Sequence, residues 1–132
     1  MALEKLTHQQ RGWCLDAFGK LSHTVYILAT GPGDVRSRLR DCFFDLAQAA
    51  ALVAPLPLPE DIAGNFRWIF QSLRKEQDEF NWKSVEARTR AMKNRTGVAI
   101  AERIVSTEAR FRSHLETLGR EREVKGDITE DT

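Results

Sequence analysis

Residues 35–54 read VRSRLRDCFFDLAQAAALVA, and apolar side chains recur in this segment every three or four positions. This spacing places one stripe of apolar side chains along a single face of an α-helix. The stripe consists of Val35, Leu39, Cys42, Leu46, Ala49 and Val53. Such a face is stable only when it is buried against another element, so the segment predicts a helix that belongs to a bundle.

Three other segments have apolar residues at the same helical spacing. Their stripes are Cys14, Phe18, Leu21, Val25 and Leu28; Ile62, Phe66, Ile69 and Leu73; and Ile100, Ile104, Phe111, Leu115 and Leu118. We therefore predict an all-α fold, a bundle of four to five helices with short connections and a disordered C-terminal tail.

The first two predicted helices are separated by a short joint. The first is expected over residues 7–29, because Thr7 and Gln10 have the spacing of a capping box. Gly31 is expected in the left-handed conformation that ends many helices, and Asp34 is expected to cap the next helix. A joint this short makes the two helices antiparallel neighbours.

The proline-rich segment PLPLP, residues 55–59, predicts a short connector before the third helix. That helix is expected to end near Gln77 and to be followed by a loop over residues 78–83. Ser84 is the candidate N-cap of the last helical region. The bundle domain is expected to span residues 1–118, and residues 119–132, which have almost no apolar content, are expected to form a flexible acidic tail.

The apolar pattern changes phase within the last helical region. Val85, Met92 and Ala99 share one face, whereas the stripe from Ile100 to Leu118 is centred roughly 100° away. Either the helix breaks near residues 94–97, or one long helix buries different faces in its two halves. The sequence leaves both alternatives open.

Composition and motifs argue against several functional classes. The 20 basic and 19 acidic side chains give a formal charge of +1, so no global field recruits nucleic acid or a membrane surface. No metal-ligand motif, phosphate loop or nucleophile–base pair is present. We therefore expect no enzyme activity, no metal and no cofactor, and no membrane span.

Cys14 and Cys42 both lie on apolar stripes. We expect two reduced core residues that act as small hydrophobes, with a disulfide between the first two helices as the alternative. No secretory signal is apparent at the N-terminus. These features favour a cytoplasmic protein.

Aromatic residues extend beyond the buried stripe on two helices. Phe44 on the second helix, and Trp68 and Phe70 on the third, lie off the main apolar faces. A helix that is apolar on more than one face is either central in the core or contacts another chain. We therefore interpret the protein as a non-enzymatic helical interaction module, for adaptor or assembly functions, that forms a homodimer or binds a helical protein partner. The expected contacts are these three residues together with the overhanging half of the last helix.

Basic residues in the last helical region support an alternative function. Residues 83–112 carry 8 basic and 3 acidic side chains. If the helix is continuous, one arc carries the candidate nucleic-acid contacts Arg88, Arg95, Arg103 and Arg110. This stripe is either a phosphate-binding surface or a solvated, salt-bridged face.

A second candidate anion site lies at residues 31–33, the turn before a helix that carries Arg36, Arg38 and Arg40. The alternative is a capped turn with solvated arginines.

Overall fold

The computed structural model describes residues 6–74 and 81–124, with side chains described as far as Thr117. Within these residues the chain forms five helices and no strand, which confirms the all-α bundle. The helices are α1 (His8–Thr30), α2 (Val35–Val53), α3 (Glu60–Ser72), α4 (Trp82–Ala91) and α5 (Asn94–Val124).

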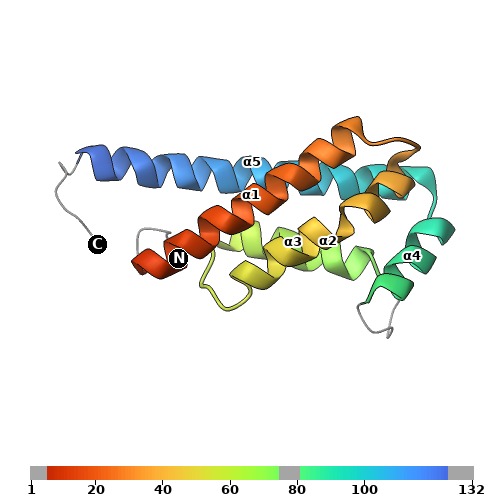
Figure 1. Ribbon diagram of the computed structural model, residues 1–132, viewed down its shortest axis with the longest axis horizontal. Coiled ribbons are helices and arrows are strands. Elements are labelled where there is room, and N and C mark those ends of the chain that lie inside the picture. The colour runs from red at the N-terminus through yellow and green to blue at the C-terminus, as the bar shows by residue number, and fades with distance from the viewer. Residues whose placement is uncertain (1–5, 75–80, 125–132) are drawn as a thin grey trace.

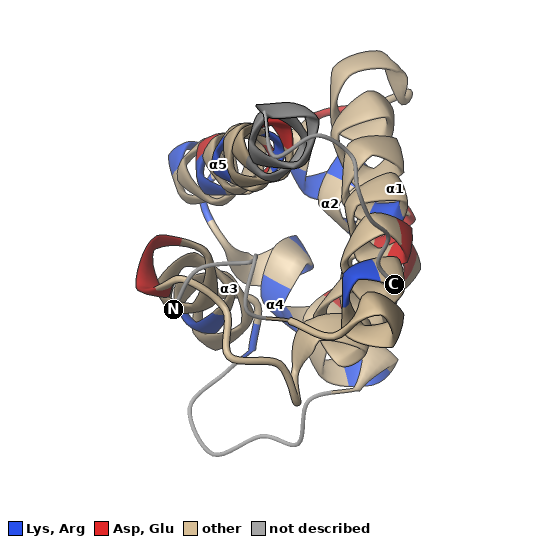
Figure 2. Cartoon of the chain, turned by 90° about the vertical axis from the view of Figure 1, so that its left-hand side faces the viewer, with Lys and Arg blue, Asp and Glu red and all other residues tan. Residues whose placement is uncertain are grey.

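The helices differ in how closely they pack. Helices α1 and α2 form an antiparallel hairpin that contains the most extensive contact in the molecule, as their short joint predicts (Figure 1). Helix α5 runs the length of the bundle and contacts α1, α2 and α3. Viewed along the bundle, α3 lies against α5, away from α1 (Figure 2). Helix α4 packs on α2.

The predicted stripes form most of the core. Those of α2 and α3 are buried except for Val35, which is half-buried. In α1, Phe18 and Val25 are only partly buried, and Ala17 and Thr24 are buried with the stripe. In α5, Ile100, Ile104 and Phe111 are fully buried and Leu115 packs against the core. The side chain of Leu118 lies outside the described residues.

Two of the predicted caps are confirmed. Thr7 and Gln10 form the expected capping box, and Asp34 accepts a hydrogen bond from the backbone N–H of Ser37 at 3.1 Å. The prediction for Gly31 was wrong, because this residue is extended, with φ −67°. Gly33 supplies the positive φ, 80°, so the reversal of direction occurs two residues later than expected.

A helix break explains the phase change in the last region. Helix α4 ends at Ala91, Met92 adopts an extended conformation with ψ 155°, and α5 begins at Asn94. The continuous-helix alternative was therefore wrong, and the break comes just before the segment where it was expected. Val85, Thr89 and Met92 are buried from α4, whereas Ala99 is exposed on α5.

Helix boundaries next to this region also differ from expectation. Asn81, and not Ser84, is the N-cap of α4: its side chain accepts from the N–H of Ser84, whose hydroxyl in turn accepts from the N–H of Asn81. Helix α3 already ends at Ser72, and Gln77 lies outside the described residues. The sequence pattern missed Asn81 because either residue type caps a helix well.

Helix α5 reaches Val124 and projects past the first turn of α1 (Figure 1). It thus enters the segment expected as the tail, of which residues 125–132 lie outside the described part. No helix of the described residues has the length and apolar character needed to cross a membrane.

Candidate functional site

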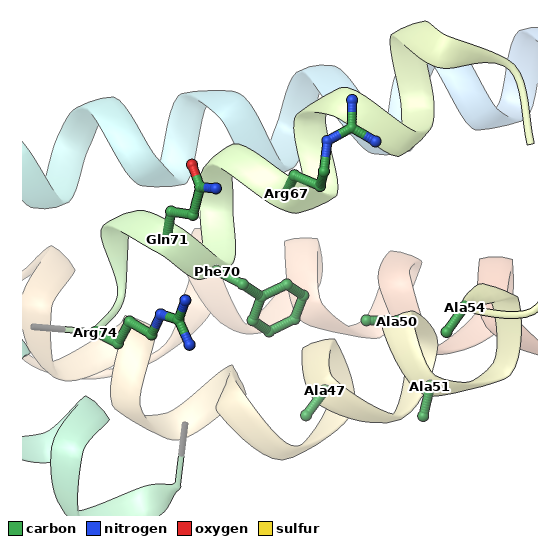
Figure 3. A pocket seen from close by; sticks show the side chains of 8 residues that line it. All are labelled: Ala47, Ala50, Ala51, Ala54, Arg67, Phe70, Gln71 and Arg74. Atoms are coloured by element: carbon green, nitrogen blue, oxygen red, sulfur yellow. The ribbon is translucent and has the colours of Figure 1, made fainter. Parts of the chain in front are cut away.

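A groove between α2 and α3 is the described feature that best suggests a binding site. Helix α3 packs on α5, and it does not pack closely along α2. The space left between them forms a cavity of about 510 Å³ (Figure 3). Three alanines of α2 and its C-cap, Ala54, line one side. Four residues at the end of the third helix and just beyond it line the other side: Arg67, Phe70, Gln71 and Arg74.

A second cavity extends this groove toward the proline-rich connector. It has a volume of about 330 Å³ and shares Ala50, Ala54, Arg67 and Phe70 with the first cavity. Leu56 and Leu58 of the connector line its far end. The groove therefore follows the second half of α2, and its walls are mainly apolar.

The floor of the groove is a flat patch of small side chains. Ala47 and Ala51 are four residues apart on α2, as are Ala50 and Ala54, so the floor consists of two short parallel rows. Ala51 and Ala54 are exposed, and Ala47 and Ala50 are half-buried. Small residues in such rows allow the backbone of another helix to approach closely, because packing helices place the ridges of one between the rows of the other.

Aromatic rings define the remaining shape of the groove. Phe70 points from α3 toward the alanines of α2, between Arg67 and Arg74 (Figure 3). One turn before Ala47, Phe44 is 61% exposed and stacks on Trp82 of α4 with ring centroids 5.6 Å apart. The exposed apolar face of α2 thus continues beyond the groove to the aromatic pair that Phe44 forms with Trp82 of α4.

The charged side chains that line the groove are all basic. Arg67 and Arg74 line the α3 side, and Lys20 of α1 lines a neighbouring surface pocket that shares Ala51 with the groove. No acidic residue lines these three cavities of the described structure. Arg67 is ion-paired with Glu60 at the start of α3, whereas Arg74 forms no ion pair with any residue in the described ranges.

The structure separates the three predicted interface residues. Phe70 lines the groove, and Phe44 lies on the same exposed side of α2, beyond Ala47. Trp68 is half-buried on the other flank of α3, where the guanidinium of Arg103 lies 4.3 Å from its ring centroid. The alanine floor itself was missed, although the run AAALVA, residues 49–54, contains more small apolar residues than the core stripe needs.

The helix break removes Arg88 from the predicted stripe of four arginines and leaves Arg95, Arg103 and Arg110 on α5. Arg88 lies on α4, where its Nε donates to the carbonyl of Ser72 at 3.2 Å. Arg103 covers Trp68, and Arg110 pairs with Asp61 at 3.6 Å. Arg95 alone of the four is both exposed and without a partner among the described residues.

The arginines after the α1–α2 turn are also engaged within the protein. Arg38 donates to the carbonyl of Leu28, Arg36 to the carbonyl of Met92, and Arg40 to the hydroxyl of Thr89. Arg36 also pairs with Asp34, the N-cap of α2, at 2.8 Å. The capped turn of the alternative is confirmed by the Asp34 cap, but its solvated arginines were wrong, because all three arginines bond within the protein.

The remaining titratable clusters are structural links between helices. His23 of α1 pairs with Asp45 of α2, and His114 of α5 lies 3.3 Å from Asp61 of α3. Glu108, buried on α5, accepts a hydrogen bond from Ser22 of α1 and pairs with Arg112. No group of three or more His, Cys, Asp or Glu side chains suited to a metal ion occurs in the ranges described.

No family model, curated protein or solved structure matches the chain. The groove between α2 and α3 is the described feature from which a function can be inferred.

Proposed function

We propose that this protein is a non-enzymatic helical interaction module, which binds a helix of another protein in the groove between α2 and α3. The observation that carries the proposal is the exposed alanine floor opposite Phe70. An apolar groove with a small-residue floor matches the mode of recognition in which an amphipathic helix places its apolar face in a groove.

The chemistry of the groove favours a helix over an extended peptide. Every buried backbone N–H and C=O group needs a hydrogen-bond partner. Alanine side chains and Phe70 supply none, and Gln71 is the only uncharged polar side chain that lines the larger cavity. A helix satisfies its own backbone groups, so it is the occupant that loses the fewest hydrogen bonds when it enters such a groove.

The exposed face of α2 is long enough for a short helix. From Phe44 to Ala54, at a rise of about 1.5 Å per residue, it extends for about 15 Å, or roughly three turns. Phe44 at one end and Phe70 along the side are the large apolar residues that would anchor a partner. A second copy of this chain, in a homodimer, is the competing occupant.

The two cysteines support a reducing compartment for this function. Cys14 and Cys42 are free and buried, and burial raises the pKa of the Cys42 thiol to about 12. Free buried thiols are typical of proteins kept in a reducing environment. We therefore propose that the interaction module acts in the cytoplasm.

The proposal is tested by selection from a displayed library of amphipathic helices about four turns long, with the intact protein as bait. Enriched helices should lose binding to Ala51→Trp, because the new side chain fills the groove. The matched control is Ala109→Trp on α5, since Ala109 is also an exposed helical alanine but lies outside the groove. Sedimentation equilibrium of the same proteins tests the homodimer.

Two results would contradict the proposal. One is a library in which no helix is enriched. The other is a set of enriched helices that bind Ala51→Trp and Ala109→Trp equally well, because binding would then occur elsewhere on the molecule.

A further inference from the structure

We infer that the occupant of the α2–α3 groove is an acidic amphipathic helix, with glutamate or aspartate flanking its apolar face. This inference rests on the proposed function, since it names the chemistry of the helix that the groove binds. The charges at the rim of the groove distinguish one class of helix from another, because the apolar floor accepts any helix with an apolar stripe.

The rim is positively charged along both edges of the alanine floor. Arg67 and Arg74 lie on the α3 side, and Lys20 lies beyond Ala51 on the α1 side. The formal charge of the whole chain is only +1, so this is a local concentration of positive charge and not a property of the surface in general. A helix with acidic residues on both sides of its apolar stripe would place its carboxylates near both edges.

The same charges disfavour a second copy of the chain in the groove. In a symmetric dimer each surface meets its own copy. Pairing two alanine faces in this way would bring Arg67, Arg74 and Lys20 of one protomer toward the same residues of the other. Like charges brought together across an interface suppress that pairing.

The two arginines differ in how available they are to a ligand. Arg67 is ion-paired with Glu60, and the side chains of both residues are largely exposed. Arg74 forms no ion pair with the described part of the chain. Among the described residues, an incoming carboxylate therefore meets no competing acidic partner at Arg74, whereas at Arg67 it competes with Glu60.

This asymmetry makes the inference sharply testable. The probes are two labelled helical peptides about four turns long, with the same leucine stripe and either glutamate or glutamine at the flanking positions. Fluorescence anisotropy with the full-length protein measures both affinities at low and high salt. The variants are Arg74→Gln, Arg67→Gln and Glu60→Gln, with Arg95→Gln as the control, since Arg95 is exposed on α5 away from the groove.

The glutamate peptide should bind more tightly than the glutamine peptide, and the difference should shrink as salt is added. Arg74→Gln should lower the affinity for the glutamate peptide roughly threefold, and Arg67→Gln should lower that affinity by a smaller factor. Glu60→Gln should strengthen its binding, because Arg67 is then released. Arg95→Gln should change the affinity for neither peptide.

Other outcomes separate this inference from the proposed function. Equal affinities for the two peptides, with binding to both lost in Ala51→Trp, would overturn the acidic partner and leave the groove as a helix-binding site. Tighter binding of the glutamate peptide that is insensitive to Arg74, Arg67 and Glu60 would also overturn it. Failure of both peptides and of the library to bind would overturn the proposed function.

Discussion

Replacing Gly97 with alanine should destabilise the protein, although the same change stabilises most helices. Gly97 lies in the first turn of α5, where this helix crosses the start of α2. A Cβ at this position would lie 2.9 Å from Cγ1 of Val35 and 3.3 Å from Cγ of Arg36. Carbon atoms pack best at about 3.5–4.0 Å, so Val35 or the helix must move.

The size of the effect follows from two opposing contributions. Alanine is favoured over glycine in a helix by about 1 kcal/mol. Overpacking costs about 1–3 kcal/mol, and Val35 has few rotamers with which to avoid the new methyl group because it is branched at Cβ. The net expectation is a loss of about 1 kcal/mol in the free energy of unfolding, or roughly 4 °C in Tm.

Gly19→Ala is the matched control. A Cβ at Gly19 in α1 would meet no atom within 4 Å. Only the gain in helix propensity remains, so this variant should be more stable by about 1 kcal/mol. Urea denaturation followed by circular dichroism measures both changes under identical conditions, and the two variants should move the midpoint in opposite directions.

A double-mutant cycle with Val35→Ala assigns the cause. In the Gly97→Ala variant, truncation of Val35 should cost less than it does in the parent protein, by at least about 0.5 kcal/mol. If Gly97→Ala instead stabilises the protein as much as Gly19→Ala does, then α5 does not approach the start of α2 closely, and the reasoning is refuted.

Two further predictions concern single side chains. Cys42 should resist alkylation at pH 8 until the protein unfolds, because burial raises the pKa of its thiol to about 12 and excludes the reagent. If the native protein were instead labelled at the rate of a free peptide thiol, the core would be open around Cys42. Arg103→Glu should lower the free energy of unfolding by about 1–2 kcal/mol, because its contacts with Trp68 and Asn65 are lost. Any nucleic-acid binding, measured by anisotropy at low salt, should be affected by Arg103→Glu no more than by Arg95→Glu. A larger loss of nucleic-acid binding for Arg103→Glu would instead favour the alternative function.

The features that the sequence predicted well are those that depend on neighbours close in the chain. The stripes of α2 and α3, the Thr7–Gln10 capping box and the Asp34 cap all follow from residues within a few turns of one another. Helix propensity, capping and periodicity act over this range. The phase change near Met92 follows from periodicity in the same way. The sequence did not show its cause, which is the helix break at the extended Met92.

The groove was not predictable in this way. It exists because α3 packs on α5 in preference to α2, and these partners are far apart in the sequence. Periodicity shows that α3 has a face to bury, but it does not show which helix will cover that face. The alanines in residues 47–54 therefore predict only a helix, because the groove depends on the position of α3.

The arginines show how partners that are remote in sequence change the interpretation of a charged residue. Arg38 donates to the carbonyl of Leu28, Arg88 to that of Ser72 and Arg36 to that of Met92. These acceptors lie in the last turn of α1, at the end of α3 and at the cap of α4.

Carbonyls at helix ends have no partner within their own helix, so these arginines satisfy groups that would otherwise require water. Much of the basic character of the chain is therefore used to hold the helices together. The cations beside the groove have no such role: Arg74 is uncompensated within the described residues, and Arg67 is held only by an exposed ion pair. Positive charge available to a partner is found beside this apolar surface as well as at Arg95, and a basic rim around an apolar surface suits an acidic helix better than it suits nucleic acid.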